Sequence, residues 1–481
     1  MQQSNSVSAA PKAGIELHGL DNAVLTEADI VLKVNNVGFD SLVPLSQIQT
    51  QADKDRYGAQ GYSAILTESE FHQVLPGVDT SKVWLTPSLG RPLLYYNPDT
   101  LATACYLEHA LLPGKQTPSA VEQLIQHMEV AVAKKDFRGS IQALPEAMRM
   151  EYFNLLLEKY PDDIQNIPGL FRLFLGNYLS VSYGFDRIRP ETFRTIMALR
   201  PPEQAQTVQE ELAGFPNPIR IYRGGGSGVS LPPEKAFSWT TSIQEALFFA
   251  GRLGPQSGYV ATATVPKDKV IYSLMNSGEK EVIVFPEDVH IEDTLHLSSL
   301  EELQAVIQNA VPMYHYYRDM LTGLEFALDS DQHGRLHTAR VLLLALTIAE
   351  LMHLPTSDRH ILSLAAMYHD TQRDNDGEDR EHGEHSAEYY RRNAKNVDPI
   401  VSFLIEYHCR PDEEGYAAVR ASHKLSKNRT RVTRLFDVFK DADALDRVRF
   451  GFTDLDLNQL RNRESKTLPL FAMQCVENIT L

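Results

Sequence analysis

The longest apolar run of the chain, VLLLALTIAELM at Val341–Met352, most constrains what it can fold into. A bilayer span needs roughly 20 apolar residues, so this run is too short to cross a membrane. It predicts a helix buried inside a globular domain. Histidines precede the run and further His and Asp residues follow it. The buried helix therefore belongs to a region that also carries side chains suited to chemistry.

Length and composition limit the class of protein. The 481 residues, 43% hydrophobic and 23% charged, predict a soluble protein of roughly two to four domains. A net charge of −17 argues against a nucleic-acid partner, which needs a basic surface. Three cysteines without a CxxC pair suit a reducing cytosol, and the polar start MQQSNSVSAAPKAGIEL lacks the apolar segment of a secretory signal. We expect a cytoplasmic protein without a membrane partner; export by a specialised secretion machine would leave no such mark.

The first part of the chain, residues 1–100, has a mixed pattern and no recognisable chemistry. Strands broken by Pro, Gly and Asn are expected at 23–39 and 82–96. The role of this region is unknown from the sequence.

The pattern then changes from helical to β and back, which predicts an α+β protein. Residues 101–295 are expected to form one domain, a helical lobe followed by a β core at 215–295 rich in Val, Ile, Tyr and Thr. Ser119 and Glu122 are expected to form a capping box where the helical lobe begins. Residues 296–481 are expected to form an all-helical domain.

The stretch IRIYRGGGSGVS predicts a short strand that runs into a glycine-rich turn. A phosphate-binding P-loop needs Lys and Ser/Thr after the glycines, at the start of a helix. Here the chain continues as LPPEKAF, which cannot open that helix. We expect the glycines to let the chain turn sharply away from the strand, which leaves room beside Arg223.

Polar residues mark this strand and two later ones. Arg223 ends the first strand, Ser238 and Thr240 lie in FSWTTS, and Glu279 and Glu281 lie in GEKEVIVFP. Within a strand, a spacing of two puts both glutamates on one face. Two carboxylates on one face repel each other, so a purely structural origin is unattractive.

This order of motifs resembles the R-S-E class of mono-ADP-ribosyltransferases, over about residues 215–295. The resemblance implies that NAD⁺ is a substrate and that Glu281 stabilises the oxocarbenium-like ribose cation, as carboxylates do in glycoside hydrolysis. It implies that Glu279 orients or deprotonates the acceptor and that Arg223 holds the NAD⁺ phosphate and ribose. Ser238 and Thr240 would brace Arg223 and Glu281 through hydrogen bonds.

Two points stay open within that resemblance. The family's Ser-Thr-Ser motif matches either Ser238–Thr240 or Thr240–Ser242. A first Glu in Glu-x-Glu often accompanies arginine as acceptor in this family. The residues implied to contact NAD⁺ are Arg223, Gly224, Ser238, Thr240 and Glu281.

The C-terminal segment carries imidazole and carboxylate groups at the ends of apolar helices. His and Asp are costly to bury without partners, so this many suggests a shared site. The residues are His333, His337, His369, Asp370, His382, His385, His408, Asp441, Asp443 and Asp446.

The series resembles the HD superfamily of metal-dependent phosphohydrolases, through YHD and KDADALDRVR. The resemblance implies a first set of metal ligands at His337, His369, Asp370 and Asp443. His382 and His408 match positions that add ligands in members with two metals, and His333 or His385 could serve instead, one helical turn away. Such ligation suits Mn²⁺, Fe²⁺, Ni²⁺, Zn²⁺ or Mg²⁺. The metal would activate a hydroxide and neutralise a phosphate.

A calcium-loop alternative for DNDGED is excluded by position. With Gly377 at the sixth position of an EF-hand loop, Gln372 would be first and Gly383 last, and neither can coordinate as required. The segment is expected to be a solvated acidic loop.

Together the motifs predict a chain with two activities. Through HGRLHT and RDNDGEDREHGEHSAEYY the chain also resembles effectors of the SidE type, which pair a mono-ADP-ribosyltransferase with a phosphodiesterase. The expected partners are NAD⁺, a protein acceptor such as a host or ubiquitin-like protein, and a phosphorylated small molecule or ADP-ribosyl group. One alternative is a stand-alone nucleotidase whose β core only senses NAD⁺. Another is an interaction protein with vestigial sites.

Overall fold

The protein contains two compact units. The computed structural model describes residues 37–63, 66–87, 91–111, 117–226, 230–252, 258–330 and 332–479. An N-terminal unit comprises residues 37–210 together with 230–231, and a C-terminal unit comprises the other described residues from 211 onward. The expected strand at 23–39 lies almost wholly outside the described residues, as does the polar start. Each unit contains one β-sheet, and the C-terminal part is helical, so the α+β class is confirmed.

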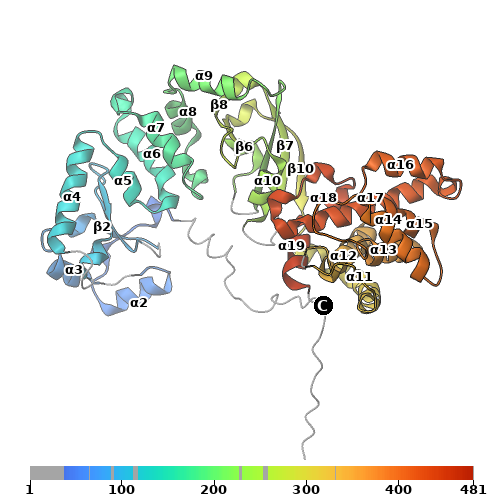
Figure 1. The fold of residues 1–481 in the computed structure, drawn as a ribbon. Helices are drawn as coiled ribbons and strands as arrows, with labels where there is room; N and C mark the ends of the chain where they lie inside the picture. The colour runs from blue at the N-terminus through green and yellow to red at the C-terminus, as the bar shows by residue number, and fades with distance from the viewer. Residues whose placement is uncertain are drawn as a thin grey trace, which may run out of the picture. The chain divides into compact units, whose positions relative to one another are not determined.

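The N-terminal unit packs helices around a small antiparallel sheet (Figure 1). The strand order of this sheet is β1-β2-β3-β4. The expected segment at 82–96 supplies two of these strands. The strands are β1 (Val43–Pro44), β2 (Val83–Leu85), β3 (Leu93–Tyr96) and β4 (Thr103–Cys105). The helices are α2 (Gln51–Ala59), α3 (Glu68–Val74), α4 (Pro118–Ala133), α5 (Arg138–Ala143), α6 (Arg149–Lys159), α7 (Leu170–Tyr178), α8 (Pro190–Met197) and α9 (Pro202–Glu211).

The capping box predicted at Ser119 and Glu122 is wrong. Helix α4 begins at Pro118, and Thr117 is its N-cap, accepting a hydrogen bond from the Ala120 amide. Proline is favoured at the first helical position because it has no amide hydrogen to satisfy there. Glu122 instead accepts a hydrogen bond from the Gly77 amide.

The C-terminal unit begins with a six-stranded antiparallel sheet of order β10-β7-β5-β6-β9-β8. The sequence pattern indicated four of these strands, in IRIYR, AFSWTTS, GYVATATV and KEVIVFP, and missed β8 and β10. The strands are β5 (Ile219–Gly226), β6 (Ser238–Thr240), β7 (Gly258–Val265), β8 (Val270–Leu274), β9 (Glu281–Val284) and β10 (His290–Leu297).

Gly224, Gly225 and Gly226 do not form the predicted turn, and Gly228 lies outside the described residues. Strand β5 continues through Gly226, and Gly224 pairs with Val260 of β7. Helix α10 (Ile243–Gly251) packs directly on β5, and a Cβ at Gly224 would lie 1.6 Å from the carbonyl oxygen of Ala246. The glycine is therefore required for close approach of the helix. Successive side chains alternate across a strand, so Arg223 points to the face opposite α10.

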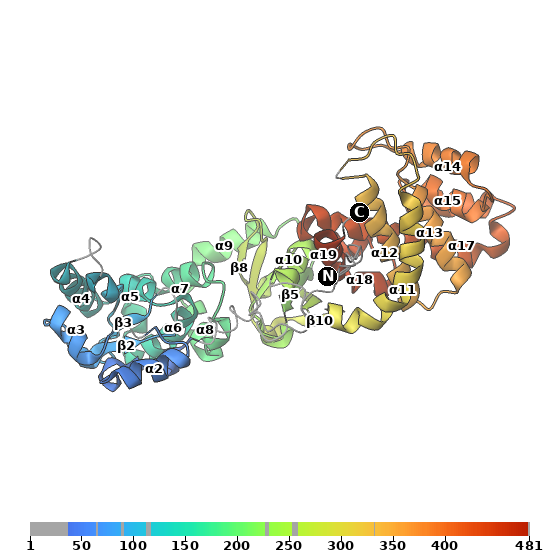
Figure 2. The same ribbon diagram turned by 90° about the horizontal axis from the view of Figure 1, so that it is seen from below.

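The helical part of the C-terminal unit follows β10 directly (Figure 2). It surrounds α12, whose apolar run is buried as predicted; the described residues contain no helix long and apolar enough to cross a membrane. The helices are α11 (Leu300–Leu321), α12 (Arg335–Leu351), α13 (Thr356–Tyr368), α14 (His382–Asn393), α15 (Pro399–Tyr407), α16 (Asp412–Ala421), α17 (Arg429–Leu445), α18 (Arg463–Lys466) and α19 (Pro469–Asn478).

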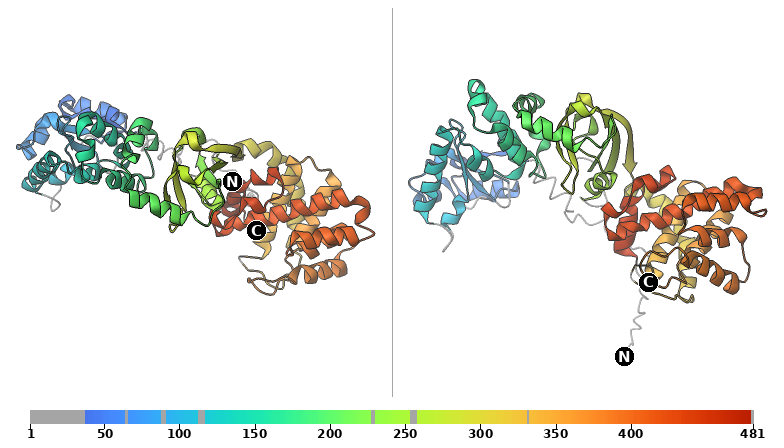
Figure 3. Two further views of the ribbon diagram at one scale, coloured as in Figure 1. Left: turned by 90° about the horizontal axis from the view of Figure 1, so that it is seen from above. Right: turned by 45° about the horizontal axis from the view of Figure 1, so that its top comes forward.

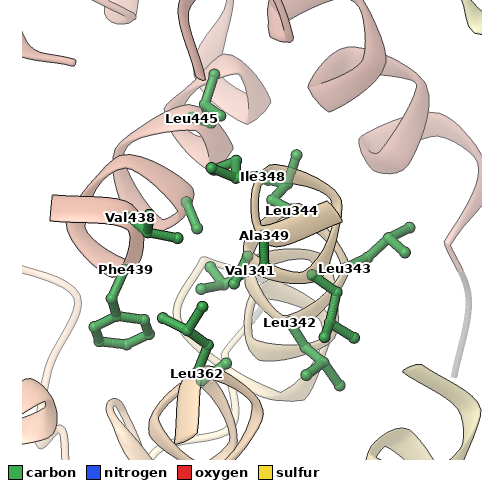
Figure 4. Packing of buried hydrophobic residues seen from close by; sticks show 14 of the residues in the cluster. Val341, Leu342, Leu343, Leu344, Ile348, Ala349, Leu362, Val438, Phe439 and Leu445 are labelled. Atoms are coloured by element: carbon green, nitrogen blue, oxygen red, sulfur yellow. The ribbon is translucent and has the colours of Figure 1, made fainter. Parts of the chain in front are cut away.

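Figure 4 shows the packing around α12. Val341 and Ile348 lie among side chains of neighbouring helices, including Leu362 of α13 and Val438 of α17. All four are fully buried, and burying a side chain of this size stabilises a fold by about 1.5–3 kcal/mol. This core holds α12, α13 and α17 rigidly, and the ends of these helices carry the predicted metal ligands.

The sheet and the helices share one hydrophobic core. Ala246 of α10 and Leu297 of β10 belong to the same buried cluster as the side chains of α12. A short 3-10 helix, η13 (Phe452–Asp454), packs on α10, and a Cβ at Gly251 would lie 2.5 Å from the Phe452 ring. Figure 3 shows this unit from two further directions. The predicted division into two domains at residue 296 stays a prediction.

Candidate metal centre and strand cluster

The six predicted metal ligands converge from five helices of the C-terminal unit. His337 lies on the first turn of α12, and His382 is the first residue of α14. Three others, His369, Asp370 and His408, lie at or just beyond helix ends. Asp443 lies on the last turn of α17. All six are buried except Asp443, whose side chain is 31% exposed, so the site is open to solvent at Asp443. The six are His337, His369, Asp370, His382, His408 and Asp443.

One group of nitrogen and oxygen atoms that could bind a metal surrounds His337. Its Nε2 lies 3.2 Å from His369 Nε2, 3.3 Å from Asp443 Oδ1 and 3.6 Å from Asp370 Oδ2. His369 Nε2 lies 3.9 Å from each of the same two carboxylates. Two nitrogens bound to one tetrahedral cation at about 2.0–2.1 Å stand about 3.3 Å apart, which matches this spacing.

A second group surrounds the other oxygen of Asp370. His382 Nε2 lies 2.9 Å from His408 Nε2. Asp370 Oδ1 lies 3.1 Å from the first of these nitrogens and 3.4 Å from the second. Asp370 thus faces both groups, with Oδ2 toward His337 and Oδ1 toward His382. The arrangement fits two cations bridged by one carboxylate.

Hydrogen bonds fix the tautomers of His369, His382 and His408 so that the Nε2 atoms which these three turn toward the centre carry no hydrogen. His369 Nδ1 lies 2.7 Å from the Ala366 carbonyl oxygen, and His408 Nδ1 lies 2.7 Å from that of Ile405. His382 Nδ1 lies 2.8 Å from the carbonyl oxygen of Asp379. A carbonyl oxygen only accepts, so Nδ1 must donate and Nε2 keeps its lone pair. Metal-binding histidines are held in this way.

The Asp370 carboxylate supplies the test of whether a cation fits. Its Oδ1 is buried and has no hydrogen-bond donor among the described residues, because the facing Nε2 atoms of His382 and His408 carry lone pairs. In the same part of the chain, no Lys or Arg side chain lies within 4.0 Å of Asp370 or Asp443. Lone pairs and anionic oxygens packed this closely repel unless a cation separates them. The residues therefore fit divalent cations.

Electrostatics keep these carboxylates ionised. Burial opposes the charge of Asp370, but the adjacent histidines, His369 first, hold its pKa well below the usual value. Burial lowers the pKa of His369 to about 4. Burial also lowers the pKa of His337, yet hydrogen bonds to Asp443 and Asp446 outweigh it and raise this pKa to about 9.

A positioning residue that the sequence reasoning left without a role is Asp446. Its Oδ2 accepts a hydrogen bond of 2.7 Å from His337 Nδ1, which orients the imidazole. Arg340 binds both oxygens of the same carboxylate, and Arg449 binds Oδ2 at 3.1 Å. Unlike Asp370 and Asp443, this carboxylate is fully compensated by arginines. In the sequence, Asp446 could have been recognised by its position three residues after Asp443.

The remaining candidates lie outside both groups. His333 is bonded through Nδ1 to Asp376 and lies 3.3 Å from Arg449 through Nε2. His385 is exposed. Asp441 accepts hydrogen bonds from the backbone amides and the side chains of Arg461 and Asn462. These bonds hold the segment around residue 461 against α17.

A second polar cluster lies on three neighbouring strands of the sheet. Ser238 Oγ donates a hydrogen bond of 2.6 Å to Glu281 Oε1. Arg223 Nη1 donates one of 2.6 Å to the Ser238 carbonyl oxygen. Strands β5, β6 and β9 are adjacent, so residues far apart in the sequence meet here. Arg223 Nε is buried and has no partner within the described part of the chain.

The other predicted residues of this cluster take different places. Glu279 lies in the turn before β9 and is exposed, and Lys280 between the glutamates has a φ of 47°. The expectation that both glutamates share a strand face is therefore wrong, because the chain is not extended between them. Thr240 Oγ1 donates to the Glu279 carbonyl oxygen and so holds this turn. Ser242 is the N-cap of α10, which leaves Ser238 as the serine that contacts Glu281.

Burial of Glu281 changes its acidity. Removal from water raises the pKa of the carboxyl to about 7; the Ser238 hydrogen bond opposes this rise, and the carboxylate of Glu279 adds to it. The group is therefore poised to change charge near neutral pH.

We expect Glu281→Gln to stabilise the C-terminal unit at pH 8 but not at pH 4.5. In wild type the unfolded chain releases this proton near pH 4.5 and the folded chain near pH 7, so stability falls as pH rises between those values. The full penalty above pH 7 is about 3 kcal/mol. The neutral amide keeps a partner for Ser238 and avoids the penalty. Urea unfolding at both pH values measures the difference, with exposed Glu234→Gln as control. An equal difference at both pH values would contradict the assignment.

Comparison with known proteins bears on the helical part. Residues 336–448 match the family model of the HD domain. No curated protein and no solved structure matches the chain. The matched segment contains all six predicted ligands, and HD domains bind divalent metals. The chain therefore contains an HD domain at residues 336–448, which supports a metal-dependent hydrolase of the phosphohydrolase type.

Proposed function

We propose that the chain is bifunctional: an NAD⁺-dependent mono-ADP-ribosyltransferase on the sheet, and a metal-dependent phosphodiesterase in the HD domain. The observation that carries the transferase half is the hydrogen-bonded cluster of Arg223, Ser238 and Glu281 on three adjacent strands. It supports the R-S-E resemblance because the bracing contacts expected of the serine are present. An isolated surface Arg and a solvated Glu pair would not both bond to one serine of the strand between them.

In the transferase reaction, Glu281 accepts a hydrogen bond from the ribose of NAD⁺ as the bond to nicotinamide breaks. Nicotinamide leaves with the electron pair, and the ribose carbon gains cationic character that the carboxylate stabilises. The acceptor then forms a bond to that carbon and gives its proton to a base. The exposed carboxylate of Glu279 suits that role and suits a cationic acceptor such as arginine on a protein. Arg223 holds the phosphate and ribose of NAD⁺.

In the hydrolase reaction, the residues of this chain hold and orient the site. When bound, divalent cations neutralise phosphate charge and lower the pKa of water. Asp370 stands between both histidine pairs, and Asp446 fixes the His337 ring. Asp443, partly exposed, marks the side from which a phosphate enters.

We propose further that the hydrolase processes the ADP-ribosyl product at its pyrophosphate, on an acceptor such as a host or ubiquitin-like protein. Both sites belong to one compact unit, which supports a shared substrate. If an HD variant, His369→Ala, processed ADP-ribosylated protein as fast as wild type, the two activities would not be coupled in this way.

The transferase is tested with labelled NAD⁺ and a mixture of candidate acceptor proteins. Wild type is expected to transfer label, and Glu281→Gln to lose at least about 100-fold of the rate, in the range found when one transition-state hydrogen bond is removed. Glu234→Gln, an exposed glutamate of the same sheet region, is the matched control. Label that does not depend on Glu281 would exclude the transferase.

A second candidate is a nucleotidase whose sheet only binds NAD⁺. The raised pKa of Glu281 favours it, since near neutral pH a sizeable part of this carboxyl is protonated and cannot stabilise a cation. Release of phosphate or AMP from nucleotides, with NAD⁺ bound but no label transferred, would support this function instead.

A further inference from the structure

Cys409 adjoins the second group of donors in the metal centre. It follows His408, just beyond the end of α15. Its sulfur and ring nitrogens of His382 and His408 lie within 4.8 Å of one another. The side chain is only partly buried, and its thiol donates a weak hydrogen bond of 3.4 Å to the Arg380 carbonyl oxygen.

The packing of α14 on the end of α15 brings these donors together. Gly383, the second residue of α14, has no side chain to separate the helices. A Cβ there would lie 2.9 Å from Cys409 Sγ and 2.9 Å from each carbonyl oxygen of Ile405 and Glu406. The glycine thus allows a contact that places His382 against His408 and leaves the thiol beside them.

Asp370 gives a second, independent indication of a bound cation at this place. Its Oδ1 faces the same two imidazoles, is buried, and meets no hydrogen-bond donor in the described ranges. Asp370, His382 and His408 together supply one oxygen and two nitrogens. A four-coordinate cation at this position needs one more donor.

We propose that the Cys409 thiolate is the fourth ligand of the cation held by Asp370, His382 and His408. Sulfur bound at about 2.3 Å stands about 3.6 Å from nitrogens bound at about 2.0–2.1 Å in a tetrahedral site. The sulfur lies within 4.8 Å of these nitrogens, so it would move by about 1.2 Å at most to reach this spacing. On binding, the thiol releases its proton to solvent, the hydrogen bond to Arg380 is lost and the sulfur–metal bond forms.

This ligand makes the two positions of the centre chemically different. A set of two imidazoles, one carboxylate and one thiolate selects Zn²⁺ over Mg²⁺ or Mn²⁺, because thiolate is a soft donor. The group around His337 has only nitrogen and oxygen ligand atoms, so it does not select for Zn²⁺ in this way. The inference depends on the metal centre but not on the identity of the phosphorylated substrate.

Cobalt spectroscopy of the full-length protein tests the ligand directly. After removal of metal by a chelator, titration with Co²⁺ is expected to produce a near-ultraviolet thiolate-to-cobalt charge-transfer band. Cys409→Ser should lose the band, and Cys105→Ala, in the N-terminal unit, should keep it. A wild-type protein saturated with Co²⁺ but without the band, or a band that survives in Cys409→Ser, overturns the proposal.

Thiol modification provides a readout that does not need the cysteine variant. Cys105 and Cys475 are buried, so the thiol that reacts fastest with an aromatic disulfide reagent is expected to be Cys409. Zn²⁺ should slow this reaction at least about 10-fold, as expected for a thiolate tied to a metal. His382→Ala should remove the protection. Equal reaction rates with and without Zn²⁺ contradict the assignment, whether or not the protein hydrolyses a phosphodiester.

Discussion

Asp370→Asn is expected to abolish phosphodiester hydrolysis and to prevent stable binding of both cations. The two oxygens of Asp370 face the two histidine pairs. Asparagine is uncharged, so both groups lose at once the negative charge that helps to bind a cation. We expect a rate reduction of roughly 10³-fold or more, which corresponds to about 4 kcal/mol of transition-state free energy. Metal analysis of the full chain and hydrolysis of a nitrophenyl phosphodiester measure the two effects.

The variant should still fold. Asparagine has nearly the shape of aspartate, and its side-chain amide can donate hydrogen bonds to the Nε2 lone pairs of His382 and His408, so this buried position keeps polar partners although the charge is lost. Zn²⁺ should raise the melting temperature of wild type by mass action and leave that of Asp370→Asn unchanged. Asp374→Asn, an exposed aspartate of the loop that follows, is the matched control. Two tightly bound cations in Asp370→Asn would show that it does not bridge them.

Arg223→Lys is expected to lower kcat/KM for NAD⁺ by about 100-fold, which corresponds to about 3 kcal/mol. The Arg223 guanidinium uses Nη1 to bind the Ser238 carbonyl oxygen, and its buried Nε keeps a hydrogen free for another acceptor. Lysine carries its donors on a single atom and cannot satisfy both directions in this planar geometry. The rate of label transfer from NAD⁺ measures the loss.

The matched control for this change lies on the same strand. Arg220 is exposed and paired with Glu292, so Arg220→Lys keeps its charge and its surroundings. It should transfer label at the wild-type rate. If Arg223→Lys were equally active, Arg223 would not hold NAD⁺, and its hydrogen bond to Ser238 would serve only to join two strands.

The residues that converge on the candidate metal centre could be singled out from the sequence because each stands at a recognisable place. His369 and Asp370 close an apolar helix, and Asp443 lies near the end of another. What could not be predicted was the choice among histidines one turn apart. His385 and His382 share a helix, but only His382 points into the buried side of α14, and that depends on how the helix is rotated against α15.

In the cluster of Arg223, Ser238 and Glu281, too, the sequence left open a choice that only contacts in the structure decide. Ser238 and Ser242 fitted the middle motif of the sequence equally well, but in the structure Ser242 is the N-cap of α10 (Ile243–Gly251). Gly224 suggested a turn, yet the contact that explains it comes from the backbone of Ala246. The contact of Gly224 with Ala246 and the hydrogen bond of Ser238 to Glu281 join residues far apart in the sequence, so neither has a signature in a single strand.

By itself, the sequence determined the elements and the chemical groups: a buried helix at Val341–Met352, a β segment before it, and His and Asp residues in the order of an HD domain. Residue types and periodicities are local properties, and they survive in the folded chain. Only the tertiary structure decided that Asp370 faces two histidine pairs, that Asp446 orients His337, and that Cys409 lies beside the second pair. These relations depend on how packed helices are rotated and spaced, which is set by close contacts such as the one at Gly383 between residues of different helices.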